Sequence, residues 1–165
     1  MIILGIDPGT SKDNFGWGII TEGTKKKKYE YVDSGIYRLS PKLSFAYKLL
    51  SIAEHVSSLI EDYKVNMMSV ESFFAFGRTK GASRIHELRG VLEYLSAYYG
   101  IPFIDVAPKT VKLLTCGDGN GSKKKVATAV TKKLGVDLKS KTSHETDALA
   151  IALCATTVQL RKKNG

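Results

Sequence analysis

The stretch Ile2-Ile3-Leu4-Gly5-Ile6-Asp7-Pro8-Gly9 opens the chain with a short apolar run that stops at an acid. An apolar run of this length that ends in a turn sequence is typical of a buried strand followed by a turn. Acids are seldom buried unless they are paired or bind a metal. The stretch therefore predicts a central strand whose end carries a chemically useful carboxylate, Asp7.

Two further strand patterns follow this run, over residues 16–21 and 29–37. The connections between the three runs are compact, which favours an antiparallel meander. Residues 44–62 then form a helix pattern, because apolar side chains recur at helical spacing on one side. These side chains are Phe45, Leu49, Ile52, Val56, Leu59 and Ile60.

The rest of the chain alternates between strand and helix patterns. In order, it predicts a strand at 65–74, a helix that ends near Tyr99, a strand at 101–106, a short helix from Pro108, a basic helix at 123–134 ended by Gly135, and a last helix at about 143–160 with Ser143 as N-cap. Three antiparallel strands followed by alternating helices and strands predict an α/β domain. We expect one domain over residues 1–165, with a five-stranded mixed sheet flanked by helices.

The positive charge of the chain is concentrated in its last quarter. The net charge is +9, and residues 123–165 contribute +7 of it, from ten Lys or Arg against three acids. Such a concentration favours a polyanion partner, because each phosphate contact releases counterions. A solvated, solubilising surface explains the same charge, and charge alone leaves both readings open.

Composition excludes some classes of protein. No run approaches the roughly 18 uncharged apolar residues that a membrane span needs. The N-terminus is too soon interrupted by Asp7 to be a secretory signal. The two cysteines, Cys116 and Cys154, have no metal-site spacing and are expected to be reduced. A cytoplasmic protein fits these features.

Two further acids stand in unusual places. Glu71 follows an apolar strand pattern and precedes two phenylalanines, and Asp147 lies one turn into the last helix, directly before an apolar run. Each acid alone has a structural explanation, such as a turn for Asp7 or the helix dipole for Asp147. Together with the basic C-terminal region, the three acids favour a metal-dependent phosphoryl-transfer site.

A histidine lies close to the third acid in the sequence. His144 is three residues before Asp147, so the two side chains project from one face of a helix. We expect His144 to join the acids, although a surface histidine at a helix start is the alternative. Glu145 points to a different helix face, and we expect it to be an exposed acid.

Three blocks of residues carry a resemblance to a known family. The blocks Ile3-Leu4-Gly5-Ile6-Asp7-Pro8-Gly9-Thr10, Ser69-Val70-Glu71-Ser72-Phe73-Phe74 and Asp147-Ala148-Leu149-Ala150-Ile151-Ala152 resemble the RuvC Holliday junction resolvases. Their order, spacing and total length fit, as does Arg89-Gly90-Val91 in the helix after the second acid. The chain departs from the family in the segment 11–18 and in its glycine-rich loop 117–121. Because of these departures, the resemblance does not determine which DNA sequence is cleaved or how far cleavage depends on a branch-migration partner.

The resemblance implies an RNase H-like fold and a homodimer whose two active sites nick opposite strands of a four-way DNA junction. It implies that Asp7, Glu71 and Asp147 are the catalytic acids and that His144 is a fourth metal ligand. For DNA binding it implies Lys112 and Lys124 near the scissile strand and Phe74 as a wedge in the junction, with Phe73 and Phe76 as alternatives. The neighbouring Lys123 and Lys125 make this segment more basic than is typical of the family, and their charge predicts that they bind DNA as well. Branch-migration proteins are further expected partners.

The resemblance implies a reaction that uses two Mg²⁺ ions, with Mn²⁺ able to substitute. Lys124 is expected to neutralise charge on the scissile phosphate. Two other classes of function are weighed against this one. A kinase-like ATPase also places an acid after its first strand, but it needs a second lobe and a much longer chain. A junction-binding module without catalysis is the other alternative, and the three intact acids argue against it.

Overall fold

The computed structural model describes residues 1–8, 14–24, 27–72 and 80–163. Its elements are β1 (Ile2–Asp7), β2 (Asn14–Glu22), β3 (Tyr29–Arg38), α1 (Phe45–Tyr63), β4 (Met67–Glu71), α2 (Lys80–Tyr98), β5 (Phe103–Val106), α3 (Pro108–Cys116), α4 (Lys123–Leu134) and α5 (Ser143–Lys163). This is the predicted order of strands and helices. The ends differ by a few residues: β4 begins at Met67, two residues into the stretch 65–74 that predicted a strand and its exit, and residues 73–74 lie outside the described ranges.

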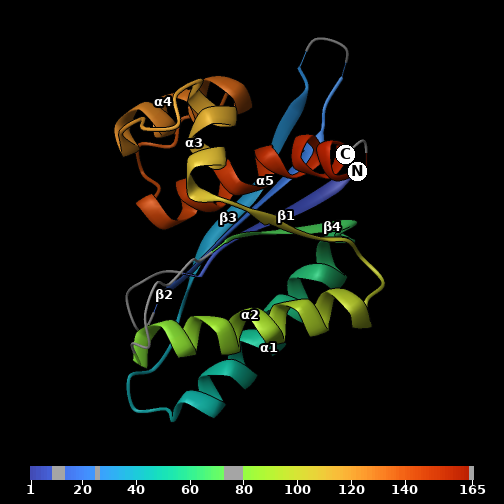
Figure 1. Cartoon of the computed structure of the whole chain (residues 1–165), viewed down its shortest axis with the longest axis vertical. Helices are drawn as coiled ribbons and strands as arrows, with labels where there is room; N and C mark the ends of the chain where they lie inside the picture. The colour runs from blue at the N-terminus through green and yellow to red at the C-terminus, as the bar shows by residue number, and fades with distance from the viewer. Residues whose placement is uncertain (9–13, 25–26, 73–79, 164–165) are drawn as a thin grey trace.

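The strands form a five-stranded mixed sheet in the order β3-β2-β1-β4-β5. β1, β2 and β3 are antiparallel neighbours, whereas β4 is parallel to β1 and β5 is parallel to β4. Helices α1 and α2 cover one face of the sheet, and α3, α4 and α5 cover the other (Figure 1). The structure therefore confirms the α/β class and the predicted meander.

Side chains alternate along β1 between two buried clusters, one on each face of the sheet. Leu4 and Ile6 pack on the side of α1 and α2, while Ile3 packs on the side of α5. Because successive strand residues point to opposite faces, Gly5 and Asp7 share the face of Ile3. The alternation therefore points the Asp7 carboxylate toward α5.

Two glycines let α5 lie directly on the centre of the sheet. A Cβ atom at Gly5 of β1 would lie 2.1 Å from the backbone oxygen of Ala148 in α5. A Cβ atom at Gly16 of β2 would lie 2.7 Å from the backbone oxygen of His144. Since Gly16 is paired with Asp7 across the strands, this close approach brings the first turn of α5 to the end of β1.

Two of the residues predicted to begin or end helices do so, and one predicted N-cap does not. Pro108 occupies the first turn of α3, and Gly135 ends α4 in the left-handed conformation at φ 61°. The predicted N-cap Ser143 is wrong, because Ser143 lies inside α5 and the hydroxyl of Thr142 accepts a hydrogen bond from the backbone N–H of Glu145 at 3.3 Å. In the described ranges, no helix is long and apolar enough to cross a membrane.

Candidate active site

Two of the predicted acids lie at the ends of adjacent parallel strands. Asp7 is the last residue of β1 and Glu71 is the last residue of β4. The register pairs Ile6 with Val70, so the two acids follow directly after paired residues. On β4 the side chain of Ser69 faces α5 and donates to the backbone oxygen of Ile151 at 3.3 Å, so Glu71 shares this face by alternation.

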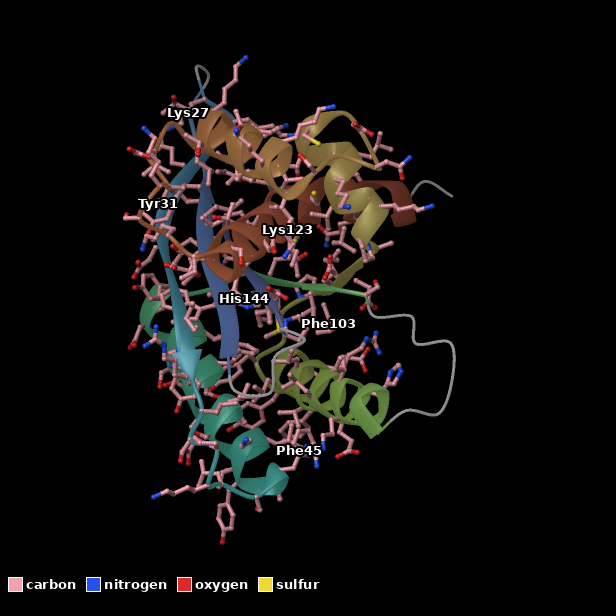
Figure 2. All side chains as sticks on the ribbon, turned by 90° about the vertical axis from the view of Figure 1, so that its left-hand side faces the viewer. Lys27, Tyr31, Phe45, Phe103, Lys123 and His144 are labelled. Carbon is pink, nitrogen blue, oxygen red and sulfur yellow. The ribbon has the colours of Figure 1, made fainter. Side chains whose placement is uncertain are left out.

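Helix α5 supplies the other two predicted residues. His144 lies in its first turn, and its Nδ1 atom lies 2.7 Å from Oδ2 of Asp7. An ionised carboxylate only accepts hydrogen bonds, so Nδ1 is the protonated nitrogen when this bond forms. Asp147 follows one turn later, and its Oδ2 accepts a hydrogen bond from Nζ of Lys123 at 3.4 Å. Figure 2 shows His144 and Lys123 on the same side of the sheet, opposite Phe45 of α1.

The three acids share one electrostatic environment. The pKa of Glu71 is raised to about 7, chiefly by burial and also by the charges of Asp7 and Asp147, while Lys123 and Lys112 oppose the shift. Burial also raises the pKa of Asp147, against the opposing charge of Lys123 and with a contribution from Asp7. Asp7 thus makes ionisation of Glu71 and Asp147 harder, Asp147 does the same to Glu71, and a bound cation would relieve this repulsion.

The donor atoms of this site suit a divalent metal ion. Carboxylate oxygens are the ligands of hard cations such as Mg²⁺, and imidazole nitrogen is accepted by Mn²⁺ and other transition metals. Within the described residues, no three His, Cys, Asp or Glu side chains already converge closely enough to form a metal cluster. The four residues fit a metal by the chemistry of their donor atoms and by their common location at this end of the sheet.

The lysines predicted to bind DNA fall into different environments. Lys123 reaches Asp147, and Lys112 acts on the pKa of Glu71. Lys125 forms an ion pair with Asp118 at 2.9 Å, which ties the start of α4 to the glycine-rich loop. Lys124 is exposed, and its side chain makes no ion pair with the acids of the site in the described part of the chain. The structure thus brings Lys123 to the carboxylates, whereas Lys124 was the predicted neighbour of the scissile phosphate.

Two other sequence predictions have different outcomes. Phe74, with its alternatives Phe73 and Phe76, lies outside the described residues. Glu145, predicted to be exposed, is instead buried, with 7% of its surface accessible. The prediction was wrong because the carboxylate caps its own helix and receives hydrogen bonds from Thr142 and Ser34. The spacing of Thr142 and Glu145 matches a capping box and was the signal that could have found this contact.

A mixed sheet in this order, with acids at the ends of its two central parallel strands and on the helix that covers them, defines an RNase H-like nuclease fold. The family model described as crossover junction endodeoxyribonuclease RuvC matches residues 3–155. The chain belongs to the RuvC family. This finding confirms the resemblance inferred from the three sequence blocks.

Individual relatives support this assignment over most of their length. The chain is 35% identical to a crossover junction endodeoxyribonuclease RuvC of Natranaerobius thermophilus, covering 93% of each chain. It is 34% identical to the corresponding protein of Synechococcus sp., covering 93% of this chain and 96% of the relative. The structure of Thermus thermophilus RuvC superposes with a TM-score of 0.81 at 25% identity, covering 98% of this chain and 96% of the other. The same protein in complex with a Holliday junction substrate gives a TM-score of 0.85 at 25% identity, covering 99% and 96%.

Proposed function

We propose that this chain resolves four-way DNA junctions by paired nicks in opposite strands. The observation that carries the proposal is the location of Asp7, Glu71, His144 and Asp147 at the same end of the sheet, where Nδ1 of His144 lies 2.7 Å from Asp7 and the charges of Asp7 and Asp147 act on Glu71. Membership of a family of crossover junction endodeoxyribonucleases supports the same activity. A Holliday junction is the substrate bound by the Thermus relative, and we extend it to this chain.

Nucleases of this family depend on metal ions, and the four residues are the proposed ligands. Asp7, at the end of the central strand, would hold the ions together with Glu71, Asp147 and His144. When bound, the ions activate the attacking water and stabilise the leaving oxygen. We propose Mg²⁺ as the natural ion, with Mn²⁺ able to substitute because it accepts nitrogen more readily.

The other residues of the site orient ligands and bind DNA. The 2.7 Å contact between Nδ1 of His144 and Oδ2 of Asp7 places the imidazole directly beside the carboxylate proposed as the central ligand. Lys123 and Lys112 place positive charge beside the acids, where a DNA phosphate would meet it. Lys124 and Phe74, which rest on the resemblance, and Lys125, which rests on the charge of its segment, are proposed as additional DNA contacts.

The proposed partners follow from the reaction. Paired nicks in opposite strands require two active sites, and one chain supplies one set of acids, so we propose a homodimer with two-fold symmetry. Branch-migration proteins remain proposed partners through the resemblance. We also propose a cytoplasmic location, in keeping with a reaction on DNA.

A cleavage assay on a labelled four-way junction and on a linear duplex of the same sequence tests this function. Each DNA is incubated with the full chain in EDTA, in Mg²⁺ and in Mn²⁺, and binding is measured in parallel by gel shift. We expect metal-dependent nicks in the junction and little cleavage of the duplex. Junction binding without nicks in either metal would instead support the binding module that lacks catalysis.

A further inference from the structure

We infer that Glu145 is a positioning residue of the active site, which holds the first turn of α5, and with it His144 and Asp147, against the sheet. The inference rests on the proposed function, because it concerns residues proposed there as metal ligands. Glu145 is 7% exposed, which is unusual for a glutamate unless its charge is compensated. Its two oxygens make separate sets of contacts, one within the helix start and one with the sheet.

One carboxylate oxygen of Glu145 caps α5. Oε2 accepts a hydrogen bond from the backbone N–H of Thr142 at 2.9 Å and another from the Thr142 hydroxyl at 3.0 Å. In return, the backbone N–H of Glu145 donates to Oγ1 of Thr142 at 3.3 Å. This reciprocal pair is a capping box, and it closes the first turn of the helix.

The other carboxylate oxygen fastens the helix start to β3. Oε1 forms an ion pair with Nζ of Lys141 at 3.1 Å and accepts a hydrogen bond from Oγ of Ser34 at 3.3 Å. Lys141 also donates to the backbone oxygen of Ser34 at 3.3 Å. A helix cap does not need contacts with a strand, so these bonds serve to locate α5 on the sheet.

The proposed ligands of α5 depend on this location. His144 directly precedes Glu145, its backbone lies against Gly16, and its ring contacts Asp7. First turns of helices fray easily when their cap is lost. Loss of the Glu145 contacts would therefore release His144 first and displace Asp147, one turn further along, to a smaller extent.

The inference predicts a weaker metal site without Glu145. The metal alone, Mn²⁺ or Mg²⁺, is titrated into the metal-free full chain, and binding is followed by calorimetry and by the rise in Tm. Glu145→Ala should raise the half-saturating metal concentration by about tenfold, as loss of an outer-shell partner commonly does. Glu145→Gln keeps an acceptor for the Thr142 N–H but loses the charge that pairs with Lys141, so it should lie between Glu145→Ala and the wild type.

The matched control is Asp105→Asn, which weakens the ion pair of Asp105 with Arg89, at 2.6 Å, on the α2 side of the sheet. It should lower Tm without changing the half-saturating metal concentration. A lower Tm with an unchanged half-saturating metal concentration in Glu145→Ala would overturn the inference, because Glu145 would then be only a helix cap.

If Glu145→Ala fails to fold, Ser34→Ala carries the test, because it removes the hydrogen bond from β3 to Glu145 and should also raise the half-saturating metal concentration. A wild-type protein that binds no metal would contradict the proposed metal site and this inference with it.

Discussion

The Nδ1 atom of His144 lies 2.7 Å from Oδ2 of Asp7, and this contact joins the first turn of α5 to the end of β1. A histidine that donates from one ring nitrogen to a carboxylate presents its other nitrogen as an acceptor or metal ligand. The contact therefore joins Asp7, the central acid, to His144, which adds a nitrogen donor to a site otherwise made of carboxylates.

His144 should set the metal preference of the enzyme. His144→Ala should raise the metal concentration needed for half-maximal nicking by about tenfold or more, with little loss of junction binding. His144→Asp should keep activity and narrow the advantage of Mn²⁺ over Mg²⁺, because it replaces nitrogen with a hard oxygen ligand. Metal titrations of nicking for the three proteins measure both effects. If His144→Ala titrates like the wild type, His144 is only a surface histidine.

Glu71 should make the metal-free protein less stable as the pH rises. Its pKa is raised from 4.5 to about 7, chiefly by burial, so between these values the folded state binds more protons than the unfolded state. Stability then falls with increasing pH across this window. Glu71→Gln removes the group that titrates, so at pH 8 in EDTA its Tm should exceed that of the wild type. The difference should be about 2–4 °C for each kcal/mol gained in the free energy of unfolding, and it should be smaller near pH 5.

Thermal melts of both proteins from pH 5 to pH 8 in EDTA measure this difference, with Glu54→Gln on α1 as the matched charge change on the other side of the sheet. A difference between wild type and Glu71→Gln that does not grow with pH would contradict the assigned environment of Glu71. In saturating Mg²⁺ the wild type should have a higher Tm than Glu71→Gln, because metal binding stabilises only the protein that keeps its ligands.

Lys123 should matter more for turnover than Lys124. Lys123 reaches Asp147 at 3.4 Å, whereas the resemblance assigned the scissile phosphate to Lys124. Lys123→Ala should therefore slow single-turnover nicking more than Lys124→Ala does. Replacing Lys123, Lys124 and Lys125 together should also make the decrease of log affinity with log salt concentration less steep, by about 2–3 in the slope, since fewer counterions are released. Equal rates for Lys123→Ala and the wild type would return the role to Lys124.

Two glycines should respond in opposite directions to the same substitution. Gly5→Ala places a methyl group 2.1 Å from a backbone oxygen of α5, so it should destabilise the protein by more than about 1–3 kcal/mol, the usual cost of overpacking. Gly90→Ala is the control, because Gly90 lies in α2 with nothing within 4 Å of an added Cβ. It should gain up to about 1 kcal/mol from helix propensity. Urea denaturation of both variants gives the comparison, and a neutral Gly5→Ala would contradict the close packing of α5.

Much of the fold follows from local sequence patterns. Apolar runs that stop at Asp7 and Glu71 mark strand ends, and Gly135 and Pro108 mark helix boundaries. These signals are local, because a strand end or a helix cap depends on residues close in the chain. The location of His144 and Asp147 on one helix face follows from helical periodicity in the same way.

Other features depend on how distant elements pack, and no local pattern contains them. Whether Lys123 or Lys124 reaches Asp147 depends on the placement of α4 against α5, which are separated by a loop. The need for glycine at position 5 appears only when α5 lies on β1. Glu145 is an intermediate case, because its capping box is visible in the sequence while its bond to Ser34 of β3 is not.

The most direct test of the proposed site maps nicks on all four strands of a labelled junction in Mg²⁺, with binding measured in parallel. The wild type should give paired nicks in two opposite strands. Asp7→Asn and Glu71→Gln should bind the junction at least as well, because each removes a negative charge that faces DNA, yet their nicking should be slower by more than about 100-fold, beyond the usual cost of losing an outer-shell partner. Wild-type nicking by either variant would contradict the assignment of these acids as the active site.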